Sequence, residues 1–248
     1  MPRATIFNPH PDDAEIGMGG SIIKLVNNGW KVEFVYMTDG SRGSDTIPPS
    51  ELIEIRTKEA REARKLLGVR EAHSFGVEDG GLPRIRADEK REIKKQISGL
   101  LRETDAVFIP SRAEAHPDHV VTHDMVWDVI SKGRKKIIVG KYLVWLFPDF
   151  YRKRSDLTNL IYLVDITDEI EKKMKAVRCH DSQVRQIRCD EMAKRMNGYF
   201  SLIFRTSGCA EILGIFNRNE TEKKLFVDLG RPHTIARVRE SWWQAVEK

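Results

Sequence analysis

The chain has few cysteines: Cys179, Cys189 and Cys209 are the only ones among its 248 residues. They are widely spaced, and no C-x-x-C pair occurs that would indicate a zinc ribbon or a redox motif. A secreted scaffold held together by disulfides is therefore excluded. We expect reduced thiols and a cytoplasmic protein.

Long apolar runs are also missing. No segment approaches the roughly 20 apolar residues that a membrane helix needs, and the first residues, MPRATIFNPHPDD, lack the apolar core of a signal peptide. Hydrophobic residues make up 40% and charged residues 32% of the chain, which is typical of a globular protein with a buried core. The sequence thus predicts no membrane partner.

The positive charge of the chain is not gathered into one stripe. The formal net charge is +5, but the basic residues form short clusters beside acidic ones, as in Lys172-Lys173, which follows Glu171. No aromatic-rich segment of the kind that binds RNA accompanies them. Solvated helix faces explain such clusters, with attraction of an anionic ligand as the alternative. We expect no nucleic-acid partner.

What the sequence does contain is a regular alternation of short β-like runs and longer helical patterns. The expected strands are 4–7, 31–38, 72–75, 105–109, 142–147 and 160–166. Helical patterns lie between them, such as one capped by Ser50 and ending at Leu67, and a last one runs from Asp168 to about His180. This order predicts an α/β fold, a Rossmann-like, doubly wound and mostly parallel sheet with helices on both faces. No repeat or linker interrupts it, so 1–248 is predicted to be a single domain.

Polar side chains follow the ends of the expected strands. In open parallel sheets, ligands bind outside the carboxyl ends of the strands, so residues in these loops meet at one edge. The residues at this edge are His10, Asp12 and Asp13 after the first strand, Asp39 and Arg42 after the second, Asp79 after the third, and His116, Asp118 and His119 after the fourth.

The glycines of GMGGS, which follow the first strand, raise the question of a dinucleotide site. Their spacing is G-x-G-G instead of G-x-G-x-x-G, and the turn before them is acidic. Because carboxylates repel a pyrophosphate, we interpret the glycines as positions where the first helix packs closely beneath the site.

Two short motifs carry the chemistry. His10-x-x-Asp13 and His116-Pro-Asp-His119 each offer metal ligands three residues apart. Two imidazoles and one carboxylate form an open Zn²⁺ site, with water in the fourth position, where the metal polarises a carbonyl and lowers the pKa of the water. The neighbouring Asp12 can then act as general base.

These residues resemble a known family. HPDD followed by a glycine-rich helix start, with HPDH at 116–119, is similar to the PIG-L/LmbE-like zinc N-deacetylases, which remove acetyl groups from N-acetylglucosaminyl compounds. Further similar segments are RTKEAREARKLLG, VEDGGLP, KAVRCHDSQ and, more loosely, CAEILGIF. The resemblance implies a zinc-dependent hydrolase of a linear amide bond, acting on a small N-acetylated amino sugar.

The resemblance also implies a role for each site residue. The zinc ligands would be His10, Asp13 and His119, and the base would be Asp12. His116 would stabilise the tetrahedral oxyanion or protonate the departing amine, with Asp118 orienting an imidazole. Arg56 and Asp79 would contact sugar hydroxyls, and His180 is a weaker candidate for a place near the site.

Several alternatives stay open at this point. Arg56 lies on a highly charged helix and Asp79 precedes two glycines, so either could be structural. His123 follows His119 by one helical turn, and H-x-x-x-H could also bind zinc. Two histidines and a carboxylate also hold iron(II) in oxygenases.

The remaining alternatives concern the whole molecule and one loop. A non-catalytic sugar-binding module could share the fold, and the sequence leaves assembly into a homo-oligomer open. Residues 42–50, RGSDTIPPS, exceed the usual length of a strand-to-helix connection and predict a mobile flap over the pocket.

Overall fold

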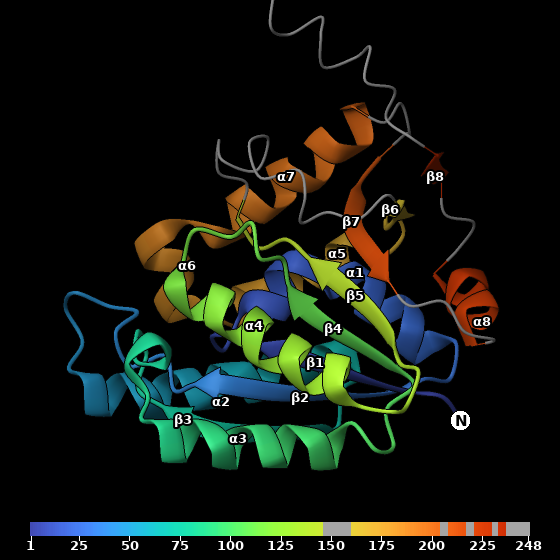
Figure 1. Ribbon diagram of the computed structural model, residues 1–248. Coiled ribbons are helices and arrows are strands. Elements are labelled where there is room, and N and C mark those ends of the chain that lie inside the picture. Colours follow the sequence, from blue (N-terminus) through green and yellow to red (C-terminus); the bar gives the residue numbers. More distant parts are fainter. Residues whose placement is uncertain (146–159, 204–207, 217–220, 230–232, 237–248) are drawn as a thin grey trace, which may run out of the picture.

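A computed structural model describes residues 1–145, 160–203, 208–216, 221–229 and 233–236. An eight-stranded sheet, of strand order β3-β2-β1-β4-β5-β7-β6-β8, forms its centre (Figure 1). The strands are β1 Arg3–Asn8, β2 Lys31–Thr38, β3 Glu71–Val77, β4 Ala106–Pro110, β5 Ile138–Tyr142, β6 Leu160–Asp165, β7 Ala210–Phe216 and β8 His233–Ala236. β3, β2, β1, β4 and β5 are parallel, whereas β7 pairs antiparallel with β5 and β6, and β8 pairs antiparallel with β6.

Helices cover both faces of the sheet, as the sequence predicts. They are α1 Asp13–Asn27, α2 Pro49–Leu67, α3 Ala87–Leu100, α4 Pro117–Lys132, α5 Ile170–Arg178, α6 Asp181–Ile187, α7 Cys189–Ile203 and α8 Thr221–Asp228, with a 3-10 turn η1 at Leu82–Arg84. Alternate side chains of β1, β2, β4 and β5 enter two cores. Phe108 of β4 packs on the side of α1, α2 and α5, and Val107 packs on the side of α3 and α4. The α/β fold with a mostly parallel sheet is confirmed.

The topology places a crevice at a defined position. β1 lies between β2 and β4, so the chain leaves β1 toward one side of the sheet and later returns to its other side. At such a switch point the loops after the two central strands diverge, and ligands bind between them. The loop after β1 carries His10, and the loop after β4 leads to His116.

Local sequence explains where the helices around this crevice begin and end. His116 is the N-cap of α4 and Pro117 is its first residue, where the missing N–H of proline is no loss. α2 ends at Gly68, whose φ of 85° is the left-handed conformation of a helix-terminating glycine. The expectation that Ser50 caps α2 is wrong, because Pro48 is the N-cap and Ser50 lies in the first turn.

The glycines after the first strand pack as the sequence predicts. A Cβ on Gly17 would come within 2.6 Å of Tyr142, and one on Gly20 within 2.5 Å of Ile166. Real side chains do not approach this closely, so α1 can lie against these residues only with glycine at these positions. The glycine-rich segment therefore serves helix packing.

The main departures from the prediction lie in the second half of the chain. The expected strand 142–147 is wrong, since β5 ends at Tyr142, and 146–147 lie outside the described residues. The N–H groups of Val144 and Trp145 bond to the carboxylate of Glu114, so they do not continue a strand ladder. The antiparallel strands β7 and β8 and the helices α6, α7 and α8 were not predicted.

Two further observations bear on the sequence-based expectations. Cys179, Cys189 and Cys209 form no disulfide. Among the described residues, none of the helices has both the length and the apolar character that crossing a bilayer requires.

Candidate metal and catalytic site

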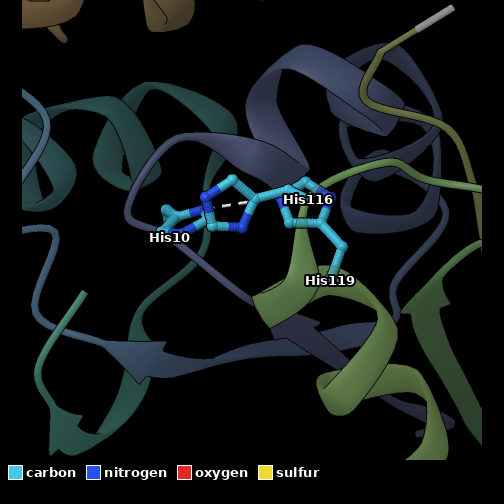
Figure 2. A group of neighbouring side chains, drawn as sticks. All are labelled: His10, His116 and His119. Carbon is cyan, nitrogen blue, oxygen red and sulfur yellow. Dashed lines mark hydrogen bonds between the residues drawn. The ribbon is translucent and has the colours of Figure 1, made fainter. Parts of the chain in front are cut away.

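Three imidazoles meet at the crevice between the loops after β1 and β4. Figure 2 shows His10 opposite His116 and His119, with the contact between His10 and His119 dashed. The ring centroids of His10 lie 4.6 Å from His116 and 5.2 Å from His119, and those of His116 and His119 lie 5.4 Å apart. β1 and β4 are paired neighbours, so histidines far apart in the sequence converge.

The donor atoms of His10, Asp13 and His119 form a nearly equilateral triangle. Asp13 Oδ2 lies 3.2 Å from His10 Nδ1 and 3.3 Å from His119 Nε2, and these two nitrogens are 3.3 Å apart. At Zn–N and Zn–O distances of roughly 2.0–2.1 Å, tetrahedral ligand atoms lie about 3.3–3.4 Å from one another. The residues present therefore fit a zinc ion, and the fourth position of the tetrahedron is left for water or substrate.

Two other groupings of donor atoms are also close. His10, His116 and His119 can each offer an atom within 4.8 Å of the others, and so can His10, Asp79, His116 and Asp118. We favour the triangle with Asp13, because all three of its edges match the ligand separations around a single tetrahedral ion. His116 Nδ1 is in addition engaged as a helix cap, accepting from the Asp118 N–H at 3.2 Å.

Opposite charges stabilise one another within the triangle. Burial raises the pKa of the Asp13 carboxyl, but the imidazoles of His119 and His10 outweigh this effect and hold its pKa well below the ordinary range. The Asp13 carboxylate also accepts the backbone N–H of His10 at 2.7 Å. Asp13 is thus kept ionised, as a metal ligand must be.

The second nitrogen of His10 faces two more carboxylates. His10 Nε2 lies 3.2 Å from Asp79 Oδ1 and 3.3 Å from Asp118 Oδ2. Burial lowers the pKa of His10, but Asp13, Asp118 and Asp79 together raise it well above its ordinary value. Asp118 is held in place by the N–H groups of Gly80 at 2.6 Å and Leu82 at 3.2 Å. The imidazole beside Asp118 is therefore that of His10.

Asp12 points to a buried guanidinium. Its Oδ2 lies 3.1 Å from Arg56 Nη2, and Arg56 is only 2% exposed. Arg56 also donates to the carbonyl of Gly40 at 3.1 Å and lies 4.0 Å from Asp79. Burial raises the pKa of Asp79, but His10 and Arg56 reverse the shift and leave that pKa lowered. Arg56 and Asp79 thus contact other site residues from inside the protein.

His116 is half-buried beside this charged group. Burial lowers its pKa, and the nearby imidazoles of His10 and His119 lower it further. The accessible part of this imidazole can hydrogen-bond to a reacting group. This geometry suits a residue that exchanges a proton with substrate.

Two histidines considered from the sequence lie off the triangle. His123 Nδ1 lies 2.9 Å from the Pro110 carbonyl, and its ring stacks on Trp127 with centroids 6.0 Å apart. His180 is fully buried, with Nε2 3.6 Å from Glu15 Oε1. Burial lowers the pKa of His180, but Glu15 outweighs it and raises the pKa. Neither residue is among the close donor groups of the described chain.

One buried acid near the site was not predicted. Glu114 is 1% exposed, and its Oε2 lies 3.8 Å from His119 Nδ1. Burial raises its pKa to about 7, although His119 and the N–H groups of Val144 and Trp145 act in the opposite direction. In the sequence it is one acidic residue in a loop, SRAEAHPDH, and nothing there distinguishes it from a solvated carboxylate.

The loop after β2 borders the same crevice. Arg42 binds Glu78 at 2.6 Å on the outside, and Gln183 of α6 donates to the Gly43 carbonyl at 3.0 Å on the inside. Pro49 and Ser50, which were assigned to the flap, belong to α2. The mobility of the loop stays a prediction.

Comparison with known proteins places this chain among deacetylases. The PIG-L family model, described as GlcNAc-PI de-N-acetylase, matches residues 5–130. Diacetylchitobiose deacetylase from Thermococcus kodakarensis is 32% identical over 196 residues, which cover 73% of this chain and 70% of that protein. A probable N-acetyl-alpha-D-glucosaminyl L-malate deacetylase 2 from Bacillus anthracis is 29% identical, over 72% of this chain and 80% of that protein.

A solved structure shares the fold. The N,N'-diacetylchitobiose deacetylase of Pyrococcus horikoshii aligns with a TM-score of 0.72 at 27% sequence identity. The alignment covers 87% of this chain and 84% of that chain.

Proposed function

The chain belongs to the PIG-L family of de-N-acetylases, and on this premise we propose that it is a zinc-dependent hydrolase that removes the acetyl group from an N-acetylglucosamine-type sugar or glycoside. The observation that carries the proposal is the triangle of His10 Nδ1, Asp13 Oδ2 and His119 Nε2, with edges of 3.2–3.3 Å. The relatives named above, which are deacetylases, support the reaction type.

In this proposal, three residues hold the metal and the neighbouring ones handle protons. His10, Asp13 and His119 would bind zinc, which when bound polarises the amide carbonyl and lowers the pKa of a coordinated water. Asp12, next to the triangle but paired with Arg56, accepts the proton of the attacking water. His116 stabilises charge on the carbonyl oxygen or passes a proton to the departing amine nitrogen.

The roles of the remaining polar residues follow from their contacts. Asp79 and Asp118 lie 3.2 Å and 3.3 Å from the far nitrogen of His10, and their negative charges favour one orientation of its ring. Arg56 orients the carboxylate of Asp12 from behind. We retain a substrate contact for Asp79, because its carboxylate belongs to the same close donor group as the half-buried His116, and assign to Arg56 chiefly the positioning of the base.

The substrate proposal is tested by a deacetylation screen. The panel holds N-acetylglucosamine, its disaccharide, its malate glycoside and its inositol glycoside, and released acetate is measured before and after chelation and zinc addition. We expect acetate from at least one compound, loss of activity on chelation and recovery with zinc. Acetate release that survives complete metal removal, or no release from any compound, would contradict the proposal.

The iron(II) alternative shares the donor set but predicts a different chemistry. An oxygenase would need dioxygen and would consume it together with a keto acid. Anaerobic assays therefore distinguish the two, because hydrolysis proceeds without dioxygen. A sugar-binding module without catalysis would keep its ligand affinity after zinc removal and would release no acetate.

A further inference from the structure

If His119 binds zinc through Nε2, its other ring nitrogen, Nδ1, needs a hydrogen-bond acceptor. If Nε2 holds a metal, the single proton of the neutral imidazole lies on Nδ1, which must then donate a hydrogen bond. His119 is 1% exposed, and among the described residues its Nδ1 has no hydrogen-bond partner. A buried N–H without an acceptor is costly, so a nearby acceptor is to be expected.

The acidic group closest to this nitrogen is the carboxylate of Glu114. Glu114 Oε2 lies 3.8 Å from His119 Nδ1 within a fully buried environment. This separation is a few tenths of an ångström longer than a hydrogen bond, and a small rotation of the Glu114 carboxyl closes it. The turn that carries Glu114 is itself fixed, because the Glu114 N–H donates to the Ser111 carbonyl at 3.2 Å and the Ser111 N–H donates to the Tyr142 carbonyl at 2.7 Å.

The two carboxylate oxygens of Glu114 have different hydrogen-bond partners. Oε1 accepts the N–H of Val144 at 2.7 Å and that of Trp145 at 3.2 Å. Among the residues that the structure describes, Oε2 accepts only the longer contact of 3.3 Å from the Trp145 N–H, and so keeps a lone pair for the imidazole. The first oxygen thus anchors the carboxylate to the segment after β5, and the second faces the metal ligand.

We propose that Glu114 is a positioning residue of the metal centre, accepting the Nδ1–H of His119 and thereby holding Nε2 toward the metal. The second nitrogen of His10 likewise lies 3.3 Å from Asp118 and 3.2 Å from Asp79, so each histidine ligand has a buried carboxylate near its other ring nitrogen. Partners of this kind orient the ring and raise the basicity of the ligand nitrogen. The inference rests on the proposed zinc function and extends it to a residue outside both histidine motifs.

The test uses zinc affinity, measured by competition with a chromophoric chelator, and the thermal unfolding of the metal-free protein. Glu114→Gln keeps a carbonyl oxygen for the Val144 and Trp145 N–H groups but turns an N–H₂ toward His119. We expect zinc affinity to fall about 10–100-fold, with the unfolding temperature of the metal-free protein unchanged. Glu33→Gln is the matched control, because Glu33 is a buried carboxylate of β2 that accepts from Thr5 and lies at the far end of the strands.

The possible outcomes distinguish a failure of the role proposed for Glu114 from a failure of the proposed zinc-dependent function. A parent enzyme that binds zinc and releases acetate, with a Glu114→Gln variant of equal zinc affinity, overturns the positioning role alone. A fall in affinity that accompanies a lower unfolding temperature of the metal-free variant also overturns it, since Glu114 then acts through the fold. A parent that binds no zinc overturns both proposals.

A second measurement covers the case in which Glu114→Gln does not fold. In the zinc-loaded parent labelled with ¹⁵N-histidine, the Nδ1 proton of His119 should be protected from solvent exchange and show the shift of a carboxylate-bonded imidazole. A rapidly exchanging proton at this position would contradict the proposal.

Discussion

The carboxylate of Asp12 and the guanidinium of Arg56 form a buried ion pair, with Oδ2 and Nη2 3.1 Å apart. Arg56 lies in α2, and Asp12 precedes α1, so the pair joins two helices on one side of the crevice. Asp13, the neighbour of Asp12, instead faces the imidazoles of His10 and His119. Two adjacent aspartates thus have separate surroundings, one beside a fixed cation and one within the metal triangle.

The first prediction separates these two aspartates. Asp12→Asn should bind zinc as the parent does, while turnover falls by a factor on the order of 10²–10⁴, because the amide cannot accept the proton. Asp13→Asn should instead weaken zinc affinity, and added zinc should restore part of its activity. Zinc content and turnover are measured for both. If Asp12→Asn loses zinc while Asp13→Asn retains it, the assignment is reversed: Asp12 is the metal ligand and Asp13 is the base.

The second prediction concerns Arg56. Arg56→Lys keeps a positive charge near Asp12 but loses the planar fork that also reaches the Gly40 carbonyl. We expect zinc content and KM close to those of the parent and a kcat reduced by roughly tenfold, because the base is less precisely held. Arg61→Lys, at an exposed ion pair with Glu62 in the same helix, is the matched control and should leave kcat unchanged. A raised KM at constant kcat in Arg56→Lys would point to a direct contact with the sugar.

The third prediction concerns the metal ligand in α4. Purified protein should hold about one zinc per chain, the stoichiometry of a single three-ligand site, and His119→Ala should remove it. His123→Ala should retain it, since His123 faces the Pro110 carbonyl and Trp127. Metal analysis after dialysis against dilute chelator measures both. Full occupancy in His119→Ala, with an empty site in His123→Ala, would refute the assignment.

The fourth prediction concerns the loop after β2. Residues 42–48 should exchange backbone amide hydrogens faster than the helices around them, and glucosamine, the product, should slow the exchange. Gln183→Ala should speed it further, because the Gln183 amide is the inner contact of the Gly43 carbonyl. Hydrogen exchange with mass detection follows all three states. Strong protection that glucosamine does not alter would rule out a flap.

The fifth prediction concerns a buried ion pair between α5 and β7, whose carboxylate also binds α1. Lys173 Nζ lies 2.7 Å from Glu211 Oε1, and both side chains are fully buried. The Glu211 carboxylate also accepts from the N–H groups of Gly20 and Ser21. Glu211→Ala should lower the free energy of unfolding by about 3–5 kcal/mol, since it leaves the lysine charge unpaired.

Urea titration of the Glu211→Ala variant measures this change. Glu191→Ala, which removes an exposed i,i+4 pair with Arg195 in α7, should cost well under 1 kcal/mol and serves as control. Equal stability losses in the two variants would mean that the buried pair is not a structural link.

Local patterns in the sequence were sufficient to predict the parallel half of the sheet and to select the candidate metal ligands. The alternation of short β-like runs with helical patterns requires parallel pairing, because each helix returns the chain to the same end of the sheet. This argument covers β1 to β4 and the helices between them. HPDD and HPDH follow two of these parallel strands, which places both motifs at the same edge of the sheet. That the two strands, β1 and β4, are neighbours was decided by the tertiary structure.

Only the tertiary structure decided the antiparallel part of the sheet and the pairing of carboxylates with imidazoles, since both depend on segments that are distant in the chain. β7 lies between β5 and β6 and runs antiparallel to both, a choice that pairing energies between strands make and local periodicity does not encode. Asp118 belongs to the HPDH motif, yet its carboxylate meets the ring of His10. Glu114 is an ordinary acidic residue of a loop until burial and the N–H groups of Val144 and Trp145 fix it beside His119. Residue type and spacing determine which atoms can bind a metal, whereas the packing of separate loops determines which carboxylate faces which ring.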